Sequence, residues 1–369
     1  MYVPFNDFRR LFSPHRAFVS NTITEVASRG EFILKQQARE LEQAICDLTG
    51  AQYATAAASA TGAILLGLKA LGVGPGIEVL TPAFGFASPV NCILNLGGKP
   101  VFVDVDFENG LLDPNLIEER ITNLTRVVLP MHLGRAVADM KTITDVAQAH
   151  NLSVLEDSAV AFAADIDGVP AGRWGNAGVF SFYPSKPLGG IGDSGMLITD
   201  DPEIAKSCRR LRNHGQEEGR RFVYQEVGWN NRMDEITAAF LLMKLPTFAA
   251  TLNRRAKIND IYDRSFAKFR DRLTPLVSAV GRGHHKYAVF VEDRDALCKY
   301  LDNCGIETEL FYAPPLHLHP AFMRLGYRTG DFPVAERLGQ GTLALPCYPE
   351  MTDEEVAYVA KKVADFYAK

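Results

Sequence analysis

The sequence predicts an α/β fold, with a large domain whose mostly parallel, mixed sheet lies between helices and a smaller C-terminal α+β domain. Short apolar runs alternate with amphipathic stretches between about residues 50 and 200. Long helical sequence follows Arg232, and two strand-like runs return in the last part of the chain. Strands that alternate with helices of this length are typical of a sheet covered on both faces.

The elements of the first part follow from their periodicity. The sequence ahead of the sheet is polar and helical in pattern, most clearly over 39–48, and predicts an N-terminal arm. Helices are expected between most of the strands, for example over 61–71 and 140–150. The expected strands are the apolar runs at 78–81, 101–105, 126–131, 153–155, 179–182 and 196–199.

After Arg232 the pattern becomes that of long helices, expected over 233–244 and 252–269, which lead out of the large domain. We therefore expect a large domain over 1–250, arm included, and a small domain over 251–369, with the boundary placed to within about ten residues. The small domain is expected to contain strands at 287–291 and 307–311 and helices at 295–303 and 353–366.

Composition indicates an ordinary globular enzyme. The chain has 369 residues, of which 47% are hydrophobic and 22% charged, enough for about two domains. A net charge of -5 without a dense basic block argues against a nucleic-acid partner. The six cysteines form no CxxC pair, and we find neither a signal-peptide pattern nor a long apolar span. We therefore expect reduced thiols, a cytoplasmic location and no membrane partner.

The strongest chemical signal lies at residues 178–190, where an apolar strand ends and a lysine follows in a turn. Pro184, Pro187 and two glycines frame Lys186. A lysine just past a strand end, where ligands of open α/β sheets bind, can be desolvated, and its lowered pKa then lets it condense with an aldehyde. A single lysine is more often solvated in a loop, so this interpretation depends on its neighbours.

Three other segments supply such neighbours. Asp157 follows the apolar run at 153–155, where a carboxylate can keep the pyridine nitrogen of pyridoxal 5'-phosphate (PLP) protonated; alone, it could equally be a helix N-cap or a metal ligand. Small residues at 59–64 open an apolar helix, and its first N–H groups could bind a phosphate, although a simple N-cap also explains them. Aromatic residues at 81–86 follow a strand, and one ring could stack on the pyridine; such rings are otherwise most often core.

Taken together, these segments make the chain resemble the DegT/StrS family of PLP-dependent sugar aminotransferases, which have PLP fold type I. The resemblance runs essentially from end to end. The segments that carry it are 30–34 (GEFIL), 71–76 (LGVGPG), 98–106 (GKPVFVDVD), 132–134 (HLG), 138–140 (ADM), 156–157 (ED), 180–186 (FSFYPSK), 228–233 (GWNNRM), 330–336 (GDFPVAE) and 344–346 (ALP).

The resemblance implies PLP as the cofactor and a homodimer with shared active sites. It also implies that Lys186 holds PLP as a Schiff base and that Asp157 pairs with the pyridinium nitrogen. The further implied contacts are Ser181 and the main chain of Ala60 and Thr61 with the cofactor phosphate, Phe86 with the ring, and Asn230 with the phosphate of the neighbouring subunit's cofactor.

The implied reaction moves an amino group from an amino acid, expected to be L-glutamate, to a keto group of a nucleotide-linked deoxysugar. Segments 192–195 and 311–319 resemble members that aminate 3-keto more than 4-keto sugars. Two alternatives remain on the same scaffold. One is a PLP enzyme acting on another ketone, such as a cyclitol or a substrate without a nucleotide, and the other is a non-catalytic regulatory or binding protein.

The chain departs from the family pattern at several positions. Val160 stands where the family usually has a glutamine that contacts the ring hydroxyl of the cofactor, so control of the cofactor's tilt is expected to loosen while the electron sink remains. Lys186 is retained, unlike in the dehydratase branch, where histidine takes its place. The other departures are Ala60, Gly85, Ile77 and Pro187, which replace the usual Gly, Thr, Asp and Asn.

Three further patterns favour other functions only weakly. The GxGxxG match at 190–195 follows a loop and runs into a strand, which is the wrong context for a dinucleotide site of a dehydrogenase. The histidines at 284–285 and 317–319 lack the spacing of a metal site, so we expect no metal and assign them to a substrate or phosphate pocket or to the surface. The basic run at 209–214 predicts a solvated helix face or a contact for a nucleotide diphosphate.

Overall fold

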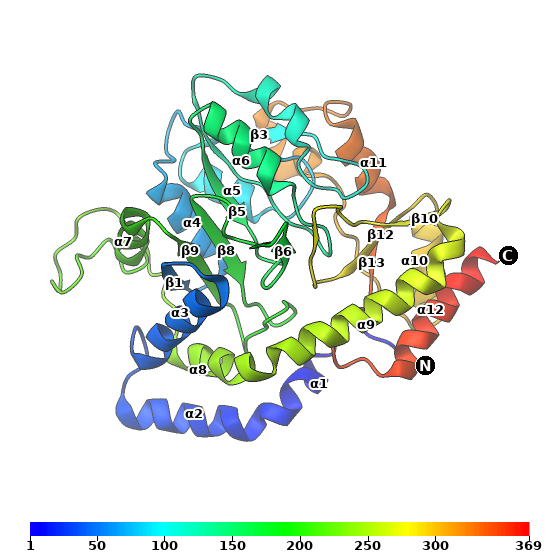
Figure 1. The fold of residues 1–369 in the computed structure, drawn as a ribbon, viewed down its shortest axis with the longest axis horizontal. Coiled ribbons are helices and arrows are strands. Elements are labelled where there is room, and N and C mark those ends of the chain that lie inside the picture. Colours follow the sequence, from blue (N-terminus) through cyan, green and yellow to red (C-terminus); the bar gives the residue numbers. More distant parts are fainter. Residues whose placement is uncertain (369) are drawn as a thin grey trace.

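A computed structural model describes residues 1–368 and contains a seven-stranded sheet with helices on both faces (Figure 1). The strand order is β1-β9-β8-β5-β4-β2-β3. The five strands from β8 to β3 run parallel, whereas β9 pairs antiparallel with both β1 and β8. The strands are β1 (Tyr53–Ala57), β2 (Glu78–Pro82), β3 (Lys99–Val103), β4 (Thr125–Val128), β5 (Ser153–Asp157), β8 (Ala177–Ser181) and β9 (Gly195–Thr199).

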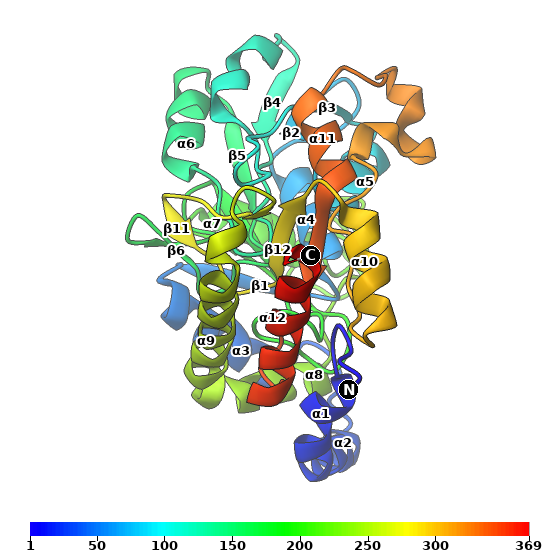
Figure 2. The same ribbon diagram turned by 90° about the vertical axis from the view of Figure 1, so that its right-hand side faces the viewer.

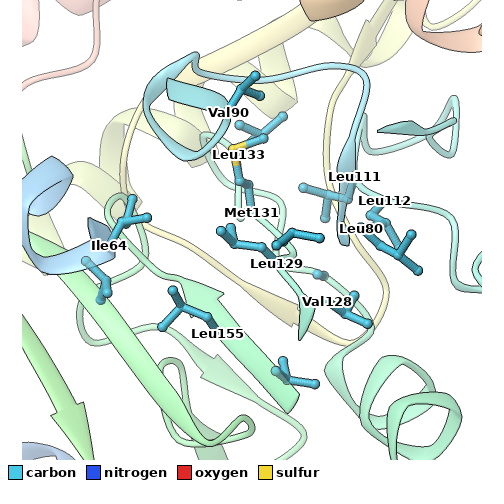
Figure 3. Close-up of a cluster of buried hydrophobic side chains, with 14 of the residues drawn as sticks. Ile64, Leu80, Val90, Leu111, Leu112, Val128, Leu129, Met131, Leu133 and Leu155 are labelled. Carbon is cyan, nitrogen blue, oxygen red and sulfur yellow. The ribbon is translucent and has the colours of Figure 1, made fainter. Parts of the chain in front are cut away.

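Both faces of this sheet are apolar, because successive residues of a strand point to opposite sides. In β9, Leu197 packs in one cluster with Ile64, while Met196 and Ile198 pack in a second cluster with Leu41. Figure 3 shows part of the first cluster, in which side chains from strands and helices converge. The helices of this part are α3 (Gln36–Thr49), α4 (Ala60–Ala70), α5 (Ser88–Asn95), α6 (Met140–Ala149), α7 (Pro202–Leu211) and α8 (Glu235–Lys244).

The N-terminal arm consists of α1 (Phe8–Phe12) and α2 (Arg16–Arg29), and α2 runs along α8 at one end of the molecule (Figures 1 and 2). Helix α9 (Phe248–Phe266) then leads to the C-terminal part, so the proposed division at residue 250 falls within it. Within residues 1–368, Glu235–Phe269 is the one helical stretch long and apolar enough to cross a membrane, and 44% of its apolar window is buried in the protein.

The C-terminal part has its own antiparallel sheet, in the order β10-β12-β13, and its own core. Tyr262 of α9, Tyr287 and Val289 of β12 and Val356 of α12 all lie in that core, which Val3 near the start of the chain also enters. Its elements are β10 (Leu273–Pro275), β12 (Tyr287–Val291), α10 (Arg294–Asn303), α11 (Pro333–Gly341), β13 (Thr342–Leu345) and α12 (Asp353–Tyr367).

A small third sheet joins the two parts. Its strands are β6 (Asp165–Ile166), β7 (Val169–Pro170) and β11 (Gly281–Arg282), and β11 from the C-terminal part pairs with β6 from the large sheet's side of the chain. The 3-10 turns are Ser13–His15, Pro114–Leu116, Glu118–Arg120, Leu245–Thr247, Ala267–Phe269, Leu316–Leu318 and Pro320–Leu325.

The predicted fold class is confirmed, and most predicted elements lie within a few residues of their observed bounds. The strand predicted at 307–311 is wrong. Only Glu309 pairs there, through an isolated bridge to Ala344, and the segment instead lines a cavity. The strand predicted at 126–131 ends at Val128, because Pro130 has no N–H group to donate to a neighbouring strand; beyond it, Met131 forms a single bridge with Asp157.

Candidate active site

One cavity, of about 410 Å³, collects six of the seven predicted site residues. It lies where the chain leaves the carboxyl ends of β1, β2, β4, β5 and β8, the edge at which open α/β sheets bind ligands. A larger cavity of about 620 Å³ beside β11 contains none of the predicted residues. The six residues in the first cavity are Ala60, Thr61, Phe86, Asp157, Ser181 and Lys186.

Lys186 sits in a closed turn after β8. Its N–H donates to the carbonyl oxygen of Tyr183 at 2.8 Å. The turn returns tightly, since a Cβ on Gly189 would lie only 2.2 Å from the carbonyl oxygen of Pro184. Desolvation lowers the pKa of the Lys186 ammonium to about 8, although the nearby Asp157 carboxylate acts in the opposite direction. An amine with this pKa is partly deprotonated near neutral pH and is therefore a competent nucleophile.

Asp157 is the last residue of β5 and is buried, with 6% of its surface exposed. Burial raises the pKa of its carboxyl group, whereas the Ala159 N–H, which donates to Oδ1 at 3.0 Å, and the positive charge of Lys186 lower it. A buried carboxylate at the base of a cavity is strongly stabilised by a cationic ligand. A protonated pyridine nitrogen is such a ligand, so Asp157 fits the nitrogen end of PLP.

The start of α4 contributes an anion site to the same cavity. Ser59 caps the helix by accepting the N–H of Gly62 at 3.0 Å, while the N–H groups of Ala60 and Thr61 belong to the first turn, which has no intrahelical acceptor. Gly195 lets β9 approach closely, because a Cβ there would lie 2.4 Å from the nitrogen of Ala60. The Ser181 hydroxyl also lines the cavity, so these groups fit a phosphate.

Aromatic rings also line the cavity. Phe86 is 59% exposed, and its ring centroid lies 6.2 Å from that of Tyr312, whose pKa is raised by burial.

Val160 also lines the cavity, at the position of the family's usual glutamine. Gly85 has a φ of +147°, and a Cβ there would lie 2.7 Å from Cε of Met131, so this methionine occupies the space that the usual threonine would need.

Asn230 does not line the cavity. It forms a bridge with Asn213, and its Oδ1 accepts a hydrogen bond from Nε of Arg232 at 3.0 Å. The neighbouring Asn231 makes a contact within its own chain. Its Oδ1 accepts a hydrogen bond from the N–H of Ala58, just ahead of α4, at 3.0 Å. The role of Asn230 toward a neighbouring subunit stays a prediction.

A buried polar network behind Asp157 was missed by the sequence reasoning. Glu156 is fully buried and accepts hydrogen bonds from Nε2 of His132 at 2.8 Å, from the Ser158 hydroxyl at 3.0 Å and from the Gly172 N–H at 2.6 Å. His132 lines the cavity, and its Nδ1 accepts the Ala138 N–H at 3.0 Å, so Nε2 carries the proton. The only sequence signal was the presence of His132 and Glu156 in the segments that carry the resemblance.

The histidines singled out in the sequence have separate surroundings. His285 is buried in the cavity wall, with 1% of its surface exposed. Burial keeps its pKa well below the usual range, so the ring is neutral. His317 is also buried, and its Nε2 lies 3.0 Å from Oε1 of Glu336. Across the described residues, no group of three or more His, Cys, Asp or Glu side chains is placed to hold a metal ion.

The two remaining sequence patterns have structural explanations. Gly195 begins β9 rather than a helix, so the GxGxxG match does not form a dinucleotide fingerprint. In the basic run, Arg212 contacts Glu42 at 2.5 Å and the Ala56 carbonyl oxygen at 2.8 Å, and Arg210 pairs with Glu226 at 3.1 Å. Both arginines therefore hold local structure.

A partly deprotonated lysine, a buried carboxylate and an anion-binding helix start in one cavity are the groups that PLP requires, and together with the fold they define a PLP-dependent enzyme of fold type I. The chain belongs to the DegT/DnrJ/EryC1/StrS aminotransferase family, whose model matches residues 15–364. The protein is therefore a PLP-dependent aminotransferase.

Similar proteins span nearly the whole chain. A "Pleiotropic regulatory protein" of Geobacillus stearothermophilus is 37% identical over 100% of this chain and 99% of its own length. A UDP-N-acetyl-3-dehydro-alpha-D-glucosamine 3-aminotransferase of Acidithiobacillus ferrooxidans is 35% identical over 97% of this chain and 96% of its own. The crystal structure of DesV from S. venezuelae in complex with a ketimine intermediate is 31% identical, with a TM-score of 0.95 and coverage of 100% and 99%. A structure of NtdA from Bacillus subtilis with bound PMP is 29% identical, with a TM-score of 0.92, and covers 100% of this chain and 86% of that one.

Proposed function

We propose that the protein transfers an amino group from L-glutamate to a keto group of a nucleotide-linked deoxysugar, with a 3-keto sugar favoured over a 4-keto sugar. The observation that carries this proposal is the placement of Lys186 and Asp157 in one cavity with an anion site. The substrate class is supported by the relative named as a 3-aminotransferase of a UDP-linked sugar, which matches almost the full chain.

Each predicted site residue then has a role in the mechanism. Bound PLP supplies an electron sink for the carbon that loses or gains a proton. Lys186 Nζ would hold the cofactor and, once released, would move the proton at the substrate carbon. Asp157 would keep the pyridine nitrogen protonated, Phe86 would cover the ring, and Ser181 with the N–H groups of Ala60 and Thr61 would bind the phosphate.

We propose further that the enzyme is a cytoplasmic homodimer, in which Asn230 reaches the phosphate of the neighbouring subunit's cofactor. Mixing Lys186→Ala subunits with Asn230→Ala subunits tests the shared site. Each variant alone is expected to be impaired, and mixed dimers regain activity because one of their two sites is then intact. Mixtures that stay as inactive as the separate variants would contradict sharing.

The proposed reaction is tested in two steps by visible absorbance. L-Glutamate is expected to convert the yellow holoenzyme to its pyridoxamine form, and a nucleotide-linked keto sugar is expected to restore the yellow band. A panel of 3-keto and 4-keto sugars bound to UDP and dTDP, with keto-cyclitols and free keto sugars beside them, identifies the acceptor. Recovery of the band only with cyclitols or free sugars would refute the nucleotide-sugar proposal. No response to any amino donor would favour a regulatory or binding role.

A further inference from the structure

The wall of the active cavity contains an ion pair with no place in cofactor binding. Lys286 directly precedes β12, Glu309 lies in the segment wrongly expected to be a strand, and both line the cavity with Lys186. The Lys286 ammonium donates a hydrogen bond to the Glu309 carboxylate. The lysine side chain is 13% exposed and the glutamate side chain 48%, so part of the carboxylate remains accessible.

Lys286 is fixed by two aromatic rings. Its Nζ lies 4.2 Å from the ring centroid of Phe5 and 5.3 Å from that of Phe311, and both rings attract a cation. Phe5 is itself held, because its N–H donates to the Glu307 carboxylate at 2.9 Å. Burial lowers the pKa of the Lys286 ammonium, and the Glu309 carboxylate opposes that effect. Lys286 is therefore a positioned anchor rather than a mobile surface lysine.

Glu309 is fixed through its backbone. Its N–H donates to the Ala344 carbonyl oxygen at 3.3 Å, and the Ala344 N–H donates to the Glu309 carbonyl oxygen at 2.8 Å. A carboxylate can accept about four hydrogen bonds, and a single ammonium uses only part of that capacity. The ion pair thus presents a preorganised hydrogen-bond acceptor to whatever enters beside Lys186.

We propose that Glu309, anchored by Lys286, selects the acceptor substrate by accepting hydrogen bonds from hydroxyl groups of its sugar ring. This inference rests on the proposed function, because it requires a sugar in this cavity. Two adjacent hydroxyl groups can donate to the two oxygens of one fixed carboxylate. L-Glutamate has no ring hydroxyl groups, so the proposed contact belongs to the sugar half-reaction alone.

The test separates the two half-reactions. For Glu309→Gln, the KM for a nucleotide-linked 3-keto sugar is expected to rise about 10- to 100-fold, as for the loss of one or two hydrogen bonds to a charged group. Conversion of the holoenzyme by L-glutamate should keep its wild-type rate. Calorimetric titration with the aminated sugar product should show the same loss of affinity. In a set of acceptors that lack ring hydroxyls one at a time, the difference between wild type and variant should vanish for at least one.

The matched control is Glu292→Gln at the other end of β12, which removes a carboxylate from an exposed pair with Arg337 and should change neither half-reaction. If Glu309→Gln does not fold, Glu309→Asp retracts the carboxylate by one methylene and gives the same comparison. Wild-type acceptor kinetics in these variants, or equal slowing of both half-reactions, would overturn the inference. A wild-type protein that reacts with L-glutamate but with no sugar would overturn the proposed function, and the inference with it.

Discussion

Replacing Arg255 by methionine is expected to loosen the turn that carries Lys186. Arg255 lies on α9, is 4% exposed, and its guanidinium donates hydrogen bonds to three backbone carbonyl oxygens. These belong to Cys347 at 2.7 Å, Ser185 at 3.3 Å and His285 at 3.5 Å. Ser185 directly precedes Lys186, whereas Cys347 follows β13, so one side chain ties the lysine's turn to the C-terminal sheet.

The size of the effect follows from these three bonds. One short and two long hydrogen bonds from a charged group together stabilise the fold by about 3–5 kcal/mol. Methionine recovers about 1–2 kcal/mol by burying an apolar side chain where a guanidinium had been desolvated. We therefore expect a net loss of about 1–4 kcal/mol in the free energy of unfolding. A lysine displaced by a loosened turn should also react about tenfold more slowly, which corresponds to about 1.4 kcal/mol.

Two measurements check this prediction, namely urea unfolding of the cofactor-free protein and the rate of the reaction with L-glutamate. The visible band of the lysine-bound cofactor and its pH midpoint should also shift, which a purely structural role would not cause. Arg254→Met is the matched control, since Arg254 contacts Asp353 and the Met351 carbonyl oxygen instead of the turn. An Arg255→Met protein that is less stable but keeps the wild-type band, midpoint and rate would refute the positioning role.

Three other predictions concern the cofactor site. Covalent capture of PLP by the cofactor-free protein should speed up as pH rises through about 8, because only the deprotonated amine of Lys186 reacts. A midpoint near 10.5 in stopped-flow absorbance, the pKa of an ordinary solvated lysine, would show that burial does not lower the pKa of Lys186. Asp157→Asn should retain the cofactor but slow the reaction with L-glutamate by about 100-fold or more, and a rate within a few-fold of wild type would refute its pairing with the pyridine nitrogen. Gly195→Ala should weaken PLP affinity by about tenfold or more, because its Cβ would press on the nitrogen of Ala60, whereas Gly192→Ala, with nothing within 4 Å, should leave the affinity unchanged in the same fluorescence titration.

The large sheet was predictable because its strands are apolar on both faces and alternate with helices. Runs such as 153–155 and 196–199 have no polar face, which is the pattern of a covered parallel or mixed sheet. Lys186 and Asp157 could be identified as site residues because each lies within a few residues of the end of such a run. Residues that follow parallel strands of one sheet meet at the same edge, and β5 and β8 are parallel neighbours.

Contacts between distant segments were not predictable in the same way. Residues 307–311 end in two apolar residues and were expected to form a strand, yet the two glutamates there pair with other segments: Glu307 with Tyr2, and Glu309 with Lys286. From the sequence, Glu156 would be expected to be exposed, yet it is fully buried and surrounded by the groups that donate hydrogen bonds to it. The sequence alone does not distinguish a polar side chain in solvent from one that is buried with all its hydrogen bonds made inside the protein.

The pairing of Val3 with Ile306 places the first few residues against the segment that lines the active cavity. Substitutions at positions 2–5 therefore act on the cavity indirectly, because the Phe5 ring lies against Lys286 in the cavity wall and the Phe5 N–H is held by Glu307. Efforts to retarget this enzyme to new sugars can vary these positions without touching the machinery that binds PLP.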